Sequence, residues 1–88
     1  MIEDIIRITE KIKKEMESNI PVLEEYINLM IKNKERSQNE IESMLDILLE
    51  YISMGMGEEQ FKKLNHYYGL FNPEFSAKYN EFYHELFD

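Results

Sequence analysis

Chain-breaking residues are rare in this sequence, because its 88 residues include only three glycines and two prolines. Glycine and proline interrupt helices, and folds made of strands and turns need many of them. So few breaks favour long helices. A chain of this length also buries too little surface for a second core. We therefore expect a single all-α domain over residues 1–88, a compact bundle of four to five helices.

The spacing of apolar residues predicts where the first helices lie. Residues 2–18 carry apolar side chains three and four positions apart, which is typical of one face of a helix. Pro21 is expected to end this helix and to start another, since proline is tolerated in a first turn. A second apolar stripe then runs from Val22 to Ile31.

Nine polar residues at 32–40 leave two interpretations open. Ser37 and Glu40 have the spacing of a capping box, which would open a new helix. Alternatively, a single long helix spans residues 21–54, because the apolar positions keep one helical register throughout.

Residues 41–54 are the most apolar segment of the chain, and their polar residues form one narrow stripe. A helix that is apolar over most of its circumference must be covered from several sides. We therefore expect this helix to be central. Gly55 and Gly57 follow it and suit the left-handed conformation that closes a helix.

Two shorter helices are expected in the last third of the chain. One opens at Glu58 and stops at Gly69. Asn72 and Pro73 then have the types expected of an N-cap and a first helical residue.

Charge is distributed unevenly along the chain. The net charge is −8, of which −7 falls in residues 37–88. That half would be repelled by nucleic acid and by anionic membranes, so we expect neither as a direct partner. The first turn carries acids instead of the bases of an export signal, and no long apolar run follows it. We therefore expect a cytoplasmic protein.

Catalytic and metal-binding patterns are weak. The absence of cysteine excludes a thiol nucleophile and a cysteine-ligated metal. Glu81 and His84 have the spacing that di-iron bundles use, but His66 lacks the matching glutamate, so the second copy of the motif is missing. We expect no enzyme activity, no metal and no cofactor, and a metal-dependent activity through Glu81 and His84 is the least favoured function.

Aromatic residues are concentrated near the C-terminus, with nine of the eleven Phe and Tyr residues between Phe61 and Phe87. We expect more rings here than two short helices can bury. Tyrosines often occupy protein interfaces because the ring is apolar and the hydroxyl is polar. The alternative is that the rings fill gaps between short helices.

The sequence therefore predicts a non-enzymatic module that binds a protein with a basic patch. The predicted contact residues are Tyr67, Tyr68, Phe71, Tyr83, Glu58, Glu59 and Glu81. Alternatives are a homodimer formed through the long 21–54 helix and mimicry of nucleic acid by the acidic helical surface.

Overall fold

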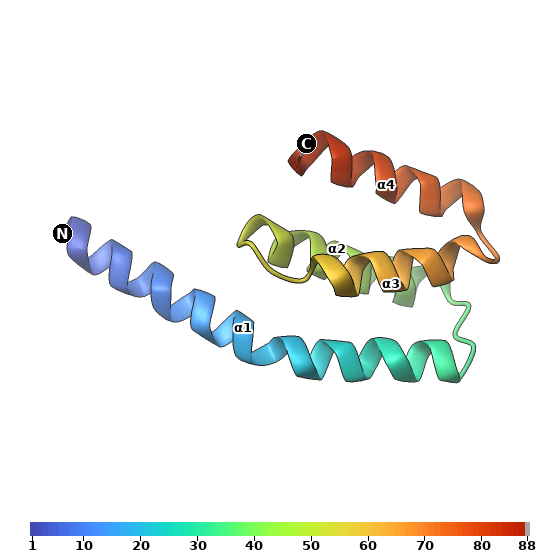
Figure 1. The fold of residues 1–88 in the computed structure, drawn as a ribbon, viewed down its shortest axis with the longest axis horizontal. Helices are drawn as coiled ribbons and strands as arrows, with labels where there is room; N and C mark the ends of the chain where they lie inside the picture. Colours follow the sequence, from blue (N-terminus) through green and yellow to red (C-terminus); the bar gives the residue numbers. More distant parts are fainter. Residues whose placement is uncertain (88) are drawn as a thin grey trace.

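A computed structural model describes residues 1–87, and most of them lie in four α-helices (Figure 1). The helices are α1 (Ile2–Lys32), α2 (Gln38–Ser53), α3 (Glu58–Gly69) and α4 (Pro73–Phe87). No β-strand occurs within residues 1–87. The prediction of an all-α bundle of four to five helices is therefore confirmed, with four helices forming one compact domain.

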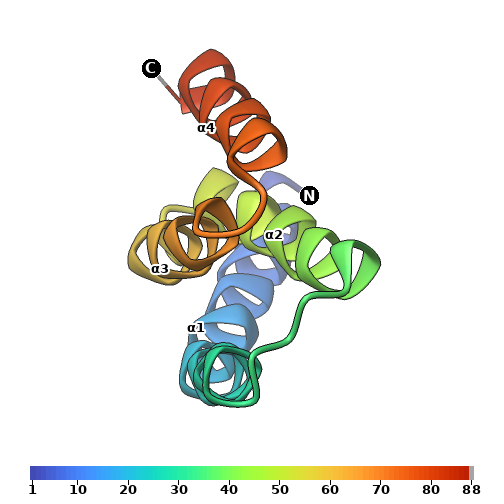
Figure 2. The same ribbon diagram turned by 90° about the vertical axis from the view of Figure 1, so that its right-hand side faces the viewer.

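The helices are arranged in three tiers. Seen end-on, α2 and α3 lie side by side, with α1 on one side of this pair and α4 on the other (Figure 2). Helix α3 packs against each of the other three helices. Residues 41–54 therefore lie in the central pair, as predicted, but α3 shares that position and is the helix that packs against all three others. Part of the apolar surface of α2 faces an open groove, and Ile47 stays exposed there.

The core contains side chains from all four helices. Its buried members are Ile27 from α1, Ile41, Leu45 and Leu48 from α2, Phe61, Leu64 and Tyr68 from α3, and Tyr79 from α4. Only one of them comes from α1, although α1 is the longest helix. The second half of α1 therefore supplies that helix's contribution to the core.

Pro21 does not end the first helix, which corrects the expected break. Helix α1 runs through Pro21 without a break, has 31 residues in all, and bends about half-way along its length (Figure 1). An interior proline removes one backbone hydrogen bond and crowds the carbonyl four residues earlier, so it bends the helix. Ile20 and Leu23 are half-buried on either side of it, and this packing keeps the two halves in one helix.

The break near Ser37 is confirmed, and a continuous helix over 21–54 is wrong. Helix α1 ends at Lys32, and α2 begins after Ser37, whose Oγ accepts a hydrogen bond from the Glu40 amide at 3.3 Å. The Ser37 amide donates to Glu35 Oε1 at 2.9 Å, so Glu35 occupies the place that Glu40 takes in a complete capping box. The side chains of these polar residues form hydrogen bonds with the free backbone amides at the start of α2, and in a helix interior they would compete with the backbone hydrogen bonds.

The turns after α2 and α3 agree with those predicted from the sequence. Gly55 and Gly57 both have positive φ, at +85° and +89°, as expected for the turn that closes α2. Pro73 is the first residue of α4, as predicted. Gly69 is the last residue of α3.

Candidate functional site

Tyr68, one of the predicted contact residues, lies in the core. Its side chain is 0 % exposed, so its predicted place on the surface is wrong. The physical reason is its register: Tyr68 follows Phe61 and Leu64 at helical spacing and turns inward with them. Its hydroxyl donates to Glu42 Oε2 at 2.7 Å, and burial followed by this hydrogen bond raises the pKa of Tyr68 well above its ordinary range.

Tyr67 and Phe71 are half-buried at the corner between α3 and α4. The Tyr67 hydroxyl donates to the backbone carbonyl of Glu35 at 2.6 Å and so ties this corner to the α1–α2 loop. The Phe71 ring meets Tyr67 edge-on, and the Arg36 guanidinium lies 5.3 Å from its centre. These rings therefore hold the bundle together and offer little free area to a partner.

Tyr83 is brought next to Glu58, another predicted contact residue. The Tyr83 ring stacks on Phe61 with 5.6 Å between ring centres, and its hydroxyl donates to Glu58 Oε1 at 2.7 Å. Lys62 forms a 2.8 Å salt bridge with the same carboxylate. Hydrogen bonds from Lys62 and from Tyr83 lower the pKa of Glu58. These groups link α3 to α4.

Glu59 and Glu81 are exposed, as is His84. No three His, Asp or Glu side chains within the described residues lie close enough to hold a metal ion. Two large apolar residues of α4 are exposed, namely Phe82 and Leu86 at 46 and 64 %. They form the main apolar surface of α4.

A polar cleft of about 350 Å³ lies between α3 and α4. Asn65 lines it and is buried, and its Nδ2 donates to the Ser76 carbonyl at 3.1 Å and to Asn80 Oδ1 at 3.0 Å. Its Oδ1 accepts no hydrogen bond. A larger groove of about 550 Å³ lies between α1 and α2 and is lined by Tyr26, Leu29, Met30, Asn33, Glu35, Glu40, Ser43, Met44 and Ile47.

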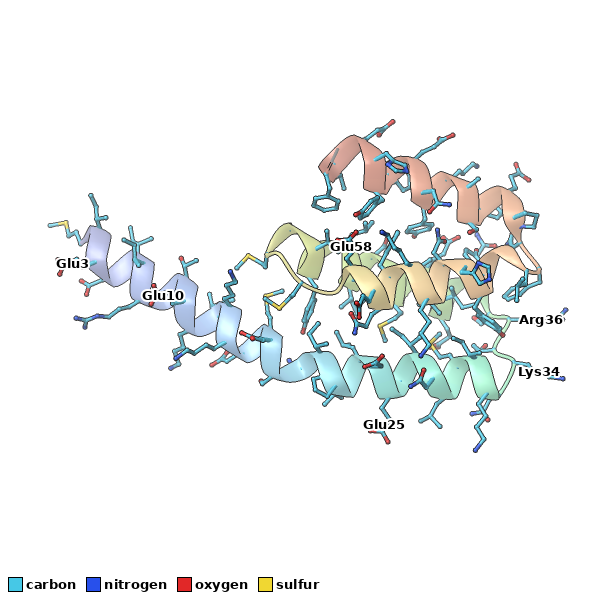
Figure 3. The ribbon with its side chains drawn as sticks, viewed as in Figure 1. Glu3, Glu10, Glu25, Lys34, Arg36 and Glu58 are labelled. Atoms are coloured by element: carbon cyan, nitrogen blue, oxygen red, sulfur yellow. The ribbon has the colours of Figure 1, made fainter. Side chains whose placement is uncertain are left out.

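The most extensive exposed apolar surface lies on residues 2–15 of α1, here called the α1 arm. Every residue of the arm is exposed, and the arm projects beyond one end of the other helices (Figure 1). Its isoleucines are between 47 and 75 % exposed: Ile2, Ile5, Ile6, Ile8 and Ile12. Figure 3 shows Glu3 and Glu10 on the arm, well apart from the bundle.

The apolar face of the arm continues the core-facing side of α1. Ile5, Ile12 and Met16 have the same helical phase as the buried Ile27, with Ile20 and Leu23 between them. Packing against the bundle begins only at Met16, which is half-buried. The next contact is a hydrogen bond of 3.4 Å from Asn19 Nδ2 to the Tyr51 hydroxyl. The arm therefore presents to solvent the side that would face a neighbouring helix.

Helix lengths explain why the arm stays uncovered. Helix α1 has 31 residues, whereas α2, α3 and α4 have 16, 12 and 15. At 1.5 Å per residue, α1 is about 46 Å long and the next longest helix only about 24 Å. The spacing of apolar residues predicts a helical face over residues 2–18, but it does not say what covers that face. Because a break was expected at Pro21, the expected helix lengths gave no sign of the arm.

None of the four described helices combines the length and the apolar character needed to cross a bilayer. Comparison of the chain with protein-family models, with curated proteins and with solved structures gives no significant match.

Proposed function

We propose that the chain is a protein-interaction module and that the apolar face of the α1 arm is its main contact surface. The observation that carries this proposal is the row of five exposed isoleucines on one ordered helix. Contiguous apolar surface of this kind is typical of interaction sites. Fully burying one isoleucine side chain contributes about 1.5–3 kcal/mol, so a partner that covers several of them gains substantial affinity.

The arm suits recognition by a helix or a helical groove. Its apolar residues repeat at the spacings by which amphipathic helices anchor in such grooves. A helical segment of about this length is marginally stable alone in water, and a partner would stabilise it. Binding would therefore stabilise the helix of the arm as well as cover its apolar face.

A second candidate surface lies on α4, where Phe82 and Leu86 are exposed beside Glu81 and Glu85. This surface keeps the predicted acidic and aromatic character, although Tyr68 is no longer part of it. A partner with a basic patch would be steered toward it by charge and held by the two apolar side chains.

A photoreactive benzophenone side chain placed on the arm tests the main proposal. We expect Ile5 replaced in this way to cross-link to a protein in cells that naturally contain the chain. The matched control is the same group at Lys11, which is exposed on the opposite face of the arm. Adducts formed equally from Lys11 and Ile5, or from neither, would contradict the proposal. Adducts formed from Phe82 alone would move the contact surface to α4.

A further inference from the structure

We propose that the α1 arm binds the α1 arm of a second copy of this chain, in antiparallel orientation. This inference rests on the proposed function of the arm and adds the identity of its partner. The two copies would be related by a twofold axis, so that each arm both covers and is covered by the other.

The shape of the molecule permits this arrangement. The arm spans 14 residues, about 21 Å of helix, and it projects from one end of the bundle (Figure 1). In an antiparallel pair the two arms overlap while the two bundles lie at opposite ends. A parallel pair would instead bring the two bundles next to each other.

The apolar stripe of one arm can pair with the same stripe of a second arm that runs in the opposite direction. It has isoleucines toward both ends and a small polar residue, Thr9, between them. An antiparallel overlap centred near Ile8 and Thr9 brings Ile5 of one copy opposite Ile12 of the other. The smaller Thr9 side chains then meet near the twofold axis, and Ile5 and Ile12 of each arm face Ile12 and Ile5 of its partner.

Charge on the arm favours the antiparallel orientation. Acids occupy the first turn at Glu3 and Asp4, and a basic cluster follows at Lys11, Lys13 and Lys14. In the overlap described above, Glu3 and Asp4 of each arm lie level with Lys14 and Lys13 of the other along the helix axis. Parallel arms would place like charges together, which is unfavourable.

The distribution of net charge over the whole chain also favours the antiparallel orientation. Residues 37–88 carry −7 of the −8, so two copies repel each other most where these segments approach. The antiparallel arrangement keeps the acidic segments of both copies at opposite ends. An anionic membrane is a poorer occupant, because the acids of the arm offset its bases.

Sedimentation equilibrium of the full-length chain tests whether the second copy binds. We expect a reversible monomer–dimer equilibrium. The double variant Ile5→Asp/Ile12→Asp should dimerise roughly a hundredfold or more weakly, because it removes both Ile5–Ile12 contacts and each costs on the order of one tenfold step in affinity. The control Arg7→Ser, on the opposite face, should dimerise like the unchanged chain. A chain that stays monomeric at all concentrations would overturn the proposal.

Introduced cysteines test the orientation, since the chain has no cysteine of its own. We expect Ile5→Cys mixed with Ile12→Cys to form a disulfide-linked dimer under mild oxidation, while each variant alone forms little. In the antiparallel pair, two copies of residue 5 lie about 10 Å apart along the helix axis, too far for a disulfide. Efficient cross-linking of Ile5→Cys to itself would indicate parallel arms and overturn the orientation.

The two proposals fail in different ways. A monomeric chain whose Ile5 cross-links to another protein keeps the interaction function and overturns the second copy as partner. A monomer that instead binds vesicles of anionic lipid through the arm overturns both. A dimer that the Ile5→Asp/Ile12→Asp variant leaves intact uses another surface and also overturns the pairing of arms.

Discussion

Gly69 lies directly against Ser76 where α3 and α4 meet, since a Cβ at position 69 would come within 3.1 Å of Ser76 Oγ. That oxygen is not free to move away, because the buried hydroxyl donates to the Asn65 carbonyl at 2.8 Å. The missing side chain therefore permits close approach of the two helices. The sequence predicts only that Gly69 ends α3, because its packing role depends on Ser76, seven positions later in the chain.

We expect Gly69→Ala to destabilise the bundle by about 1 kcal/mol. The alanine gains about 1 kcal/mol in helix propensity, but crowding in a packed contact costs about 1–3 kcal/mol. Urea unfolding followed by circular dichroism measures the difference. Ser76→Ala should make the same Gly69→Ala change less harmful, because it removes the oxygen nearest to the new Cβ. A stabilised Gly69→Ala variant would show that the two helices separate easily.

Tyr68→Ala should remove a large part of the stability of the domain. Replacing a fully buried aromatic side chain by alanine costs about 3–5 kcal/mol, against a total of about 5–15 kcal/mol for a domain. Tyr68→Phe keeps the ring and loses the hydrogen bond to Glu42, so we expect a smaller loss of about 1–3 kcal/mol. Thermal unfolding of both variants provides the comparison. If Tyr68→Ala were nearly as stable as the unchanged chain, the Tyr68 ring would have to lie on the surface.

The sequence predicted local features well and tertiary features less well. The cap at Ser37, the glycine turn after α2 and the start of α4 at Pro73 depend on residues near each other in the chain, and all three are confirmed. Periodicity also marked the apolar face of residues 2–18 correctly. It could not show that this face lies beyond the reach of the shorter helices.

The partners of the aromatic side chains could not be predicted from the sequence for a similar reason. The hydroxyl of Tyr67 meets the Glu35 carbonyl, 32 residues away in the chain, and the hydroxyl of Tyr83 meets Glu58. No local pattern predicts such partners. Tyr68 follows Phe61 and Leu64 at helical spacing, and this register places its ring in the core with theirs.

Gly57→Ala should destabilise the chain more than Gly55→Ala. Both positions have positive φ, which costs an alanine about 1–2 kcal/mol. A Cβ at position 57 would also lie 3.1 Å from Tyr51 Cβ, which is fixed to the α2 backbone, whereas position 55 opens onto free space. We expect an additional loss of about 1 kcal/mol for Gly57→Ala. Equal unfolding midpoints in urea for the two variants would show that the α2–α3 turn shifts without resistance.

Stability should fall at alkaline pH because of Tyr68 and Tyr79. Burial, followed by hydrogen bonds to Glu42 and Asp46 respectively, raises the pKa of each phenol in the folded state. Their stabilising effect is therefore fully present below the unfolded pKa of about 10 and is lost as the pH rises toward the folded values. We expect the tyrosinate absorbance of two rings to appear together with loss of helical circular dichroism. The Tyr68→Phe/Tyr79→Phe variant should lack this increase in tyrosinate absorbance at high pH. Ionisation of both rings while the chain stays fully helical would contradict the burial argument.

Removal of residues 2–15 should leave the bundle as stable as before, because every one of these side chains is exposed. Substitutions at exposed positions usually change stability by less than about 0.5 kcal/mol, and an arm without tertiary contacts should behave in the same way. Ile27→Ala is the contrasting variant, since Ile27 is fully buried and its loss should cost about 2–5 kcal/mol. Unfolding should be measured at low protein concentration, where self-association adds nothing to the apparent stability. A large drop in the unfolding midpoint of the shortened chain would mean that the arm folds back onto its own bundle, and its isoleucines would then be unavailable to a second copy.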